Sequence, residues 1–206
     1  MTFVATGSEI ARAISNARLF VDSKAEYAPD VVHVELSETG VAFAGFDDYA
    51  VGRDEIGNVG DFPLYFEVTD EGAEAIEKAA RSARNASVSL ALDEISLVLT
   101  VGEEETETRA LEASEAWRVV LPLLEPSCEP AELPRTVAFQ GARLARFGRV
   151  KGVKDAPIDI RFEPNESGAP TALVRVGPTF RGELQGLRRD VAAEHLGASA
   201  GLCFWE

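Results

Sequence analysis

Residues 2–21, TFVATGSEIARAISNARLFV, place a short apolar strand directly before an amphipathic helix. Thr6 and Glu9 have the spacing of a capping box, which predicts that the helix begins at about Ser8. Apolar residues recur at helical spacing and give this helix one apolar face, formed by Ile10, Ile14, Ala17 and Val21. The segment therefore predicts a strand over 2–5 and a helix over 8–21.

The same order of elements recurs twice more along the chain. Three strand-like runs follow the first helix, at 31–36, 41–46 and 49–56. In the first run Val32, Val34 and Leu36 alternate with polar residues, which predicts one solvent-exposed face. The second unit has a strand at 64–68, a helix at 70–84 and strands at 87–92, 96–101 and 106–111. The third has a strand at 136–140, a helix at 141–151 and strands at 158–163, 171–176 and 179–185. This repetition predicts an α+β fold with antiparallel sheets and with the helices gathered on one side.

Residues 113–135 interrupt the repeat. Proline recurs there, which removes backbone donors and prevents helix continuation, so we interpret the stretch as a connector. We expect its apolar first half, 117–124, to pack on a domain. The predicted organisation is a complete domain over 1–112, with units at about 1–58 and 62–112, then the connector at 113–135, a third unit over 136–190 and a tail over 191–206.

The composition is that of a chain without membrane spans or metal sites. No apolar run approaches the roughly 18 residues that cross a bilayer, and the N-terminus lacks the pattern of a signal peptide. The two cysteines, Cys128 and Cys203, form no CxxC pair, and together with two scattered histidines they give no zinc site. We therefore expect a cytoplasmic protein without a metal or other cofactor.

The net charge of −15 argues by itself against nucleic-acid binding, but the cations are unevenly distributed. The helix windows 7–24, 70–85 and 140–154 hold 11 of the 20 lysines and arginines and only six of the 35 acidic residues. Within these helices Arg12, Lys78 and Arg81 lie roughly opposite the apolar positions. A further ridge is spaced at i, i+3, i+6 and consists of Arg143, Arg146 and Arg149.

Arginine is common on helix surfaces in general. Three basic helices in an acidic chain nevertheless favour sequence-independent contact with a nucleic-acid backbone.

Several segments together resemble the bacterial DNA polymerase III beta sliding clamp. They are the opening strand and helix at 3–21, Val41–Val51, the connector start Trp117–Pro122, the hairpin Leu173–Gly182 and the end Leu187–Arg189. The resemblance covers residues 2–190 and depends on the order and spacing of the segments. That family has three domains of two units each. This chain has three units, like the abbreviated clamp-like proteins of actinobacterial phages and plasmids.

The resemblance implies a non-catalytic processivity factor with helices inside and antiparallel sheets outside, in contact with double-stranded DNA. The expected DNA-binding residues are Arg12, Arg18, Lys24, Lys78, Arg81, Arg84, Arg143, Arg146, Arg149, Lys151 and Lys154. The family receives peptides, such as those of a polymerase or clamp loader, in a groove lined by a Met-Pro-Met-like run. Here the matching positions are Gln185, Gly186 and Leu187, followed by Arg188. The resemblance also implies a homo-oligomer.

Two alternatives remain. An enzyme would need a catalytic constellation, yet no serine or cysteine accompanies His33 or His195, and no phosphate-binding loop is present. Asp47-Asp48 would suit acid–base chemistry or a polar turn, and Glu103–Glu105 a metal or a hairpin turn; we favour the turns. The second alternative is a clamp-fold protein-interaction module that does not encircle DNA.

The third unit bears on assembly. A unit of about 55 residues is marginal for burying its own core, and it exposes a sheet edge. We expect residues 136–190 to complete a domain with a second chain, the alternative being that they fold back on residues 1–112.

Overall fold

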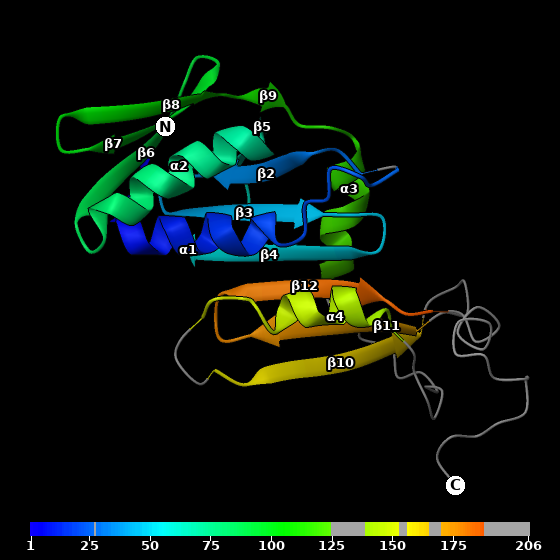
Figure 1. Cartoon of the computed structure of the whole chain (residues 1–206). Helices are drawn as coiled ribbons and strands as arrows, with labels where there is room; N and C mark the ends of the chain where they lie inside the picture. Colours follow the sequence, from blue (N-terminus) through cyan, green and yellow to red (C-terminus); the bar gives the residue numbers. More distant parts are fainter. Residues whose placement is uncertain (27, 125–138, 153–155, 165–169, 188–206) are drawn as a thin grey trace, which may run out of the picture.

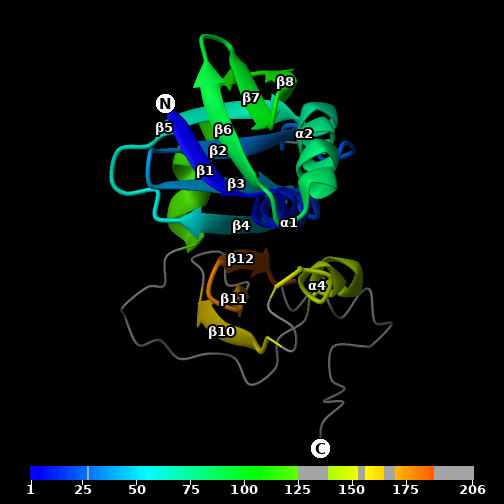
Figure 2. The ribbon, with the colours of Figure 1, turned by 90° about the vertical axis from the view of Figure 1, so that its left-hand side faces the viewer.

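The computed structural model describes residues 1–26, 28–124, 139–152, 156–164 and 170–187. Helices α1 (Gly7–Arg18), α2 (Asp70–Ala83) and α4 (Gly141–Phe147) lie on one side of the sheets (Figure 1). Helix α3 (Ala116–Val120) and the 3-10 turn η1 (Leu121–Leu124) lie on the other side (Figure 2). This arrangement confirms the predicted α+β fold. None of the helices in the described ranges has the length and apolarity that crossing a membrane requires.

All strands pair antiparallel. A four-stranded sheet has the order β1 (Thr2–Thr6), β6 (Ser87–Asp93), β7 (Ser96–Val101), β8 (Glu104–Arg109). An eight-stranded sheet has the order β10 (Ile158–Pro164), β11 (Pro170–Val176), β12 (Phe180–Gln185), β4 (Ala50–Gly57), β3 (Gly40–Phe46), β2 (Val31–Leu36), β5 (Leu64–Thr69), β9 (Leu111–Glu112). The predicted strands 31–36 and 96–101 have the observed bounds.

The first two units exchange their first strands. Strand β1 of the first unit pairs with β6 of the second, and β5 of the second pairs with β2 of the first. Helices α1 and α2 pack together so closely that a Cβ atom on Gly7 would overlap the carbonyl oxygen of Ala80. The core between them is aliphatic, with Ile10, Ile76 and Leu90 fully buried. Each unit therefore covers the apolar face of the other.

The third unit joins this domain edge to edge, because β12 pairs with β4. Gly182 lies opposite Gly52 in this pairing, and a Cβ atom on either glycine would overlap a phenylalanine ring. A cluster of phenylalanine rings fills this space. The ring centroid of Phe20 lies 5.0 Å from that of Phe147 and 5.7 Å from that of Phe180. One edge of the third unit is thus closed within the same chain, through folding back, where we expected a second chain.

The connector covers the outer face of the eight-stranded sheet. Trp117 is buried against Phe46, and its ring stacks 4.4 Å from His33. The prediction that residues 117–124 pack on a domain is confirmed by Trp117 and Leu124. The prediction of a solvent-exposed face on strand 31–36 is wrong, because His33 and Glu35 are buried there. The alternation of apolar and polar residues correctly assigned the side chains to the two faces of the strand. It carries no information about a distant segment that covers one of these faces.

Two local predictions also need correction. Helix α4 ends at Phe147 instead of 151, and the backbone of Lys151 is held by Asn16 of α1 instead of by a helical turn. Glu104 and Glu105 belong to strand β8, so that only Glu103 stays in the turn. Of the predicted strand 136–140, residues 136–138 lie outside the described ranges, as does the tail.

Candidate nucleic-acid interface

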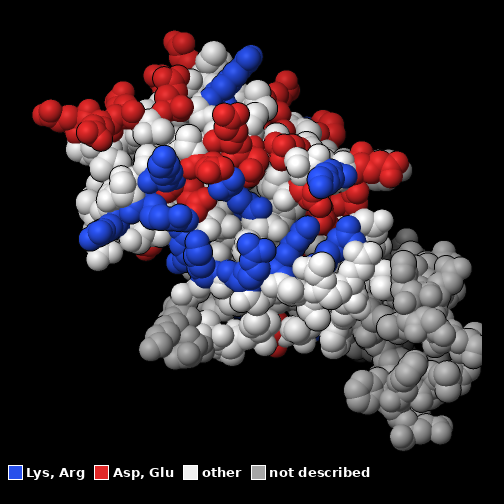
Figure 3. All heavy atoms as spheres, in the orientation of Figure 1, with Lys and Arg blue, Asp and Glu red and all other residues white. Residues whose placement is uncertain are grey.

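Lysine and arginine side chains form a band across the helix side of the molecule (Figure 3). The band lies between α1 and α4 in the view of Figure 1, and aspartates and glutamates gather above it. The separation of basic helices from acidic strands and loops in the sequence is therefore also a separation in space.

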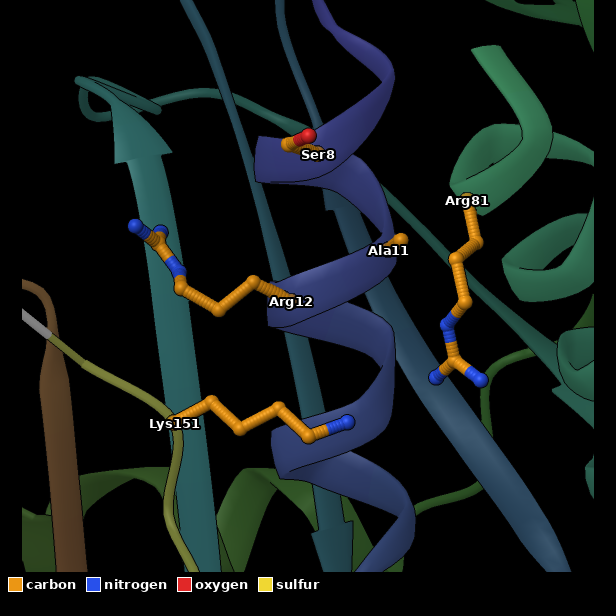
Figure 4. Close-up of a pocket in the computed structure, with 5 residues that line it drawn as sticks. All are labelled: Ser8, Ala11, Arg12, Arg81 and Lys151. Carbon is orange, nitrogen blue, oxygen red and sulfur yellow. The ribbon is translucent and has the colours of Figure 1, made fainter. Parts of the chain in front are cut away.

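The band contains a shallow open hollow of about 180 Å³ at the first turns of α1. Its lining comes from three elements far apart in the sequence: Ser8, Ala11 and Arg12 of α1, Arg81 of α2 and Lys151 after α4. Figure 4 shows the Lys151 ammonium reaching toward α1 and the Arg81 guanidinium lying along the other flank of α1. Three cations thus surround one surface depression.

A buried network fixes two of these cations. Asp54 is fully buried and accepts hydrogen bonds from Arg12 Nε at 3.3 Å and Asn16 Nδ2 at 2.6 Å. Asn16 also binds the backbone of Lys151 in both directions, at 2.7 Å each. The Lys151 ammonium donates to Ser15 Oγ at 2.7 Å. Asn16 and Asp54, which sequence reasoning did not single out, therefore position the predicted residues Arg12 and Lys151.

Arg18 is turned away from the band and into the contact between α1 and α2. Its guanidinium lies within 3.0 Å of carboxylate oxygens of Asp70, Glu74 and Glu77, and its side chain is 21% exposed. Hydrogen bonding to Asp70, followed by Glu77, raises the pKa of Arg18 further above its ordinary value. Its charge is compensated within the fold, so Arg18 joins the helices together.

Arg143 and Arg146 do not form an outward ridge with Arg149. Both reach the buried carboxylate of Asp47, at 3.4 and 2.6 Å, and the Arg143 guanidinium lies 3.8 Å from the ring centre of Tyr49. Asp47 Oδ1 also accepts from the amides of Tyr49 and Ala50 at 2.8 Å, so the polar-turn interpretation of Asp47 is confirmed. A buried carboxylate requires nearby cations, and α4 supplies them.

The remaining predicted cations differ in their exposure to solvent and in whether they form ion pairs. Arg81 is 61% exposed and contacts Glu77 of the same helix. Within the described residues, no ion pair involves the exposed side chains of Lys24, Lys78, Arg84 and Arg149. Lys154 and Arg188 lie outside the described ranges.

The predicted partner-peptide residues extend the end of β12. The amide of Gln185 donates to the Tyr49 carbonyl at 2.8 Å, and that of Gly186 to the Pro170 carbonyl at 2.7 Å. A Cβ atom on Gly186 would overlap that carbonyl oxygen. Gln185 and Leu187 are half-buried beside it. The backbone amides of Gln185 and Gly186 are therefore already bonded to neighbouring backbone carbonyls.

Comparison with known proteins identifies the fold. No family model and no curated protein matches the sequence. Among solved structures, the DNA polymerase sliding clamp of Bacillus subtilis matches with a TM-score of 0.66 and 13% identity over 91% of this chain and 64% of that chain. The beta subunit of DNA polymerase of Streptococcus pyogenes gives 0.64 and 13% over 91% and 65%. The Helicobacter pylori beta clamp bound to a DNA ligase peptide gives 0.59 and 10% over 91% and 66%.

The alignments span slightly less than two thirds of the length of these solved proteins. The chain therefore has the fold of bacterial DNA sliding clamps, the beta subunits of DNA polymerase III.

Proposed function

We propose that this protein is a clamp-like DNA tether that holds the backbone of duplex DNA without reading its sequence. The observation that supports this most is the hollow where Arg12, Arg81 and Lys151 meet on a chain of net charge −15. Cations gathered from three distant segments on one face of an acidic protein suit a polyanion. The role would be that of a non-catalytic processivity or accessory factor.

The contact would be loose. The side chains of Arg81 and Arg149 are exposed, whereas Arg12 and Lys151 are held in place from behind by Asn16 and Asp54. Phosphates would approach cations whose positions are fixed while water fills the rest of the interface, which lets a protein slide. Lys24, Lys78 and Arg84 would add long-range attraction, since no ion pair among the described residues neutralises them.

The domain plan belongs to the same proposal. Residues 1–112 would form a complete clamp-like domain, 113–135 the connector and 136–190 the third unit. Peptides of a polymerase or clamp loader would be the protein partners, near the end of β12, and the protein would act as a homo-oligomer in the cytoplasm. The ligase peptide on the Helicobacter pylori clamp is what motivates a peptide partner here.

Charge reversal on the band tests this function. Arg81→Glu, Arg149→Glu and Lys151→Glu together replace exposed cations without touching the buried Asp54. We expect binding to a duplex to weaken at least ~10-fold, with a shallower dependence of log K on log salt, because phosphate contacts are lost. The matched control is Arg118→Glu on α3, on the opposite side of the sheets, where the side chain is 79% exposed.

The proposal fails if the triple variant binds duplex DNA like the wild type, or if Arg118→Glu has an equal effect. Binding that does not change with salt would point to the second candidate, a clamp-fold protein-interaction module. That candidate is favoured by one finding, namely that carboxylates of the same chain engage several of the predicted cations. These cations are Arg12, Arg18, Arg81, Arg143 and Arg146.

A further inference from the structure

Among the described residues, the third unit leaves an apolar face largely uncovered. Only Phe162 at one end of this face has a described ring stacked on it, that of Phe139, with ring centroids 6.0 Å apart. Alternate residues of β10 carry this face: Ile158, Ile160 and Phe162 are 47%, 40% and 36% exposed. Their register partners on β11 are Val176, Val174 and Ala172, which are buried beneath α4 with Phe147. The exposed row therefore lies on the helix side of the sheet. It extends the apolar surface of the core beyond the part of the sheet that α4 covers.

Figure 1 shows α4 in front of β11 and β12, with β10 beyond it at the free edge. On α4 itself, Leu144 is 39% exposed. Among the described residues, β10 pairs only with β11. An open edge and an apolar face thus coincide on one element.

The equivalent strands of the first two units show what normally covers such a row. Strands β2 and β6 hold the place of β10, directly after the helix of their unit. Their apolar residues are buried: Val32, Val34 and Leu36 are 0% exposed, and Val88 and Leu90 are 2% and 0% exposed. The cover comes from the partner unit, whose first strand pairs with β2 or β6 and whose helix packs against α1 or α2.

We propose that the third unit of a second copy covers this face, so that two chains build one composite domain around a two-fold axis. The first domain supplies the template, because there one unit packs against another of the same design with reciprocal strand exchange. A unit that pairs with its own copy across a two-fold axis uses the same patch on both sides, as closed dimers do. The contact would also extend the eight-stranded sheet, which already crosses from the first domain through β4 and β12.

The charges favour a second copy at this edge. On β10 the charged residues Asp159, Arg161 and Glu163 alternate with the apolar row and lie on its other face. On α4 the residues beside Leu144 include the exposed Ala142 and Ala145, and alanines likewise form much of the contact between α1 and α2. Two copies would meet through apolar and small side chains without like charges opposed.

The assembly would have three domains in a row, two complete and one composite. Lys151 and Arg149 follow α4, so each copy would bring these cations close to the composite domain. The inference rests on the homo-oligomer of the proposed function, for which it names the contact surface, and does not depend on DNA binding.

Solution mass without DNA tests the inference. We expect the wild-type protein to sediment at twice the chain mass of 22.1 kDa at high micromolar concentration. Ile160→Glu should sediment at the mass of one chain, because a charge on the row cannot be buried in the contact. Ile95→Glu is the matched control, since Ile95 is 66% exposed in the turn between β6 and β7 and should leave the dimer intact.

Ile158→Lys serves as a second variant should Ile160→Glu fold poorly, and circular dichroism checks that each variant is folded. A wild-type monomer would overturn the inference, and so would a folded Ile158→Lys or Ile160→Glu variant that stays dimeric. Concentration-independent protection of the β10 amides in hydrogen exchange would likewise show that the same chain covers the row. The triple variant in the cationic band should remain dimeric, which keeps this result separate from the DNA proposal.

Discussion

His33 is buried on the outer face of the sheet, and neither of its ring nitrogens has a hydrogen-bond partner among the described residues. It stacks on Trp117 of the connector at 4.4 Å. Burial, together with the charge of Arg53, lowers the pKa of His33 from 6.5 to about 3. Between about pH 3 and pH 6.5 the ring is therefore mostly neutral in the folded protein, whereas an exposed histidine is mostly protonated.

This depressed pKa predicts acid sensitivity. Below pH 6.5 the unfolded chain takes up a proton that the folded chain refuses, so the free energy of unfolding falls as the pH drops from 6.5 toward 3. The loss approaches ~4 kcal/mol at the lower end. His33→Phe keeps an aromatic ring in the stack and cannot titrate. We expect the stability of this variant relative to wild type to rise steadily below pH 6.5 in urea unfolding, and a constant difference would contradict the assignment.

At the scale of elements, the strands and the starts of α1 and α2 could be predicted because their signals are local. Thr6 caps α1 through the predicted capping box with Glu9, and Thr69 caps α2. The direction of the arginines on α4 could not be predicted. Arg146 binds Asp47, which is 99 residues away, and helical phase alone cannot show which buried carboxylate a helix will meet.

The cationic hollow could be predicted only in part, because the sequence shows where cations occur but not which distant carboxylates they meet. Charge counting identified Arg12, Arg81 and Lys151 as members of basic helices or their flanks. It could not separate the exposed Arg81 and Lys151 from Arg12, which is paired with Asp54, or from Arg18, which is held by three carboxylates of α2. Only the packing of α1 on α2 distinguishes a cation that joins helices from one that faces solvent.

The role of α4 predicts an effect on stability. Arg143→Gln with Arg146→Gln leaves the Asp47 carboxylate, which is 1% exposed, with backbone partners alone. We expect the free energy of unfolding to fall by about 3 kcal/mol, because an unpaired buried charge is expensive. Arg149→Gln is the control and should change it by less than ~0.5 kcal/mol. Adding Asp47→Asn to the double variant should restore part of the loss, and its failure to do so would contradict this pairing.

At the scale of the whole molecule, two of the four edge strands of the described sheets, β10 and β8, have opposite chemistry. Strand β10 presents isoleucines and a phenylalanine, whereas β8 at the end of the four-stranded sheet presents Glu104, Glu105 and Glu107, all exposed. Charged edge strands resist pairing with copies of themselves. Of these two edges, β10 is therefore suited to assembly, and β8 is suited to limit it.

Removing the charges of β8 should release that limit. With Glu104, Glu105 and Glu107 replaced by threonine, the edge gains β propensity and loses its like charges, so we expect species larger than the wild-type assembly in sedimentation velocity. The matched control removes three exposed glutamates outside the strands, through Glu26→Thr, Glu38→Thr and Glu103→Thr. It changes the net charge equally and tests whether lower overall repulsion is enough to drive association. If both triple variants keep the wild-type mass, the β8 glutamates do not limit growth; if both grow equally, the cause is net charge and not the edge.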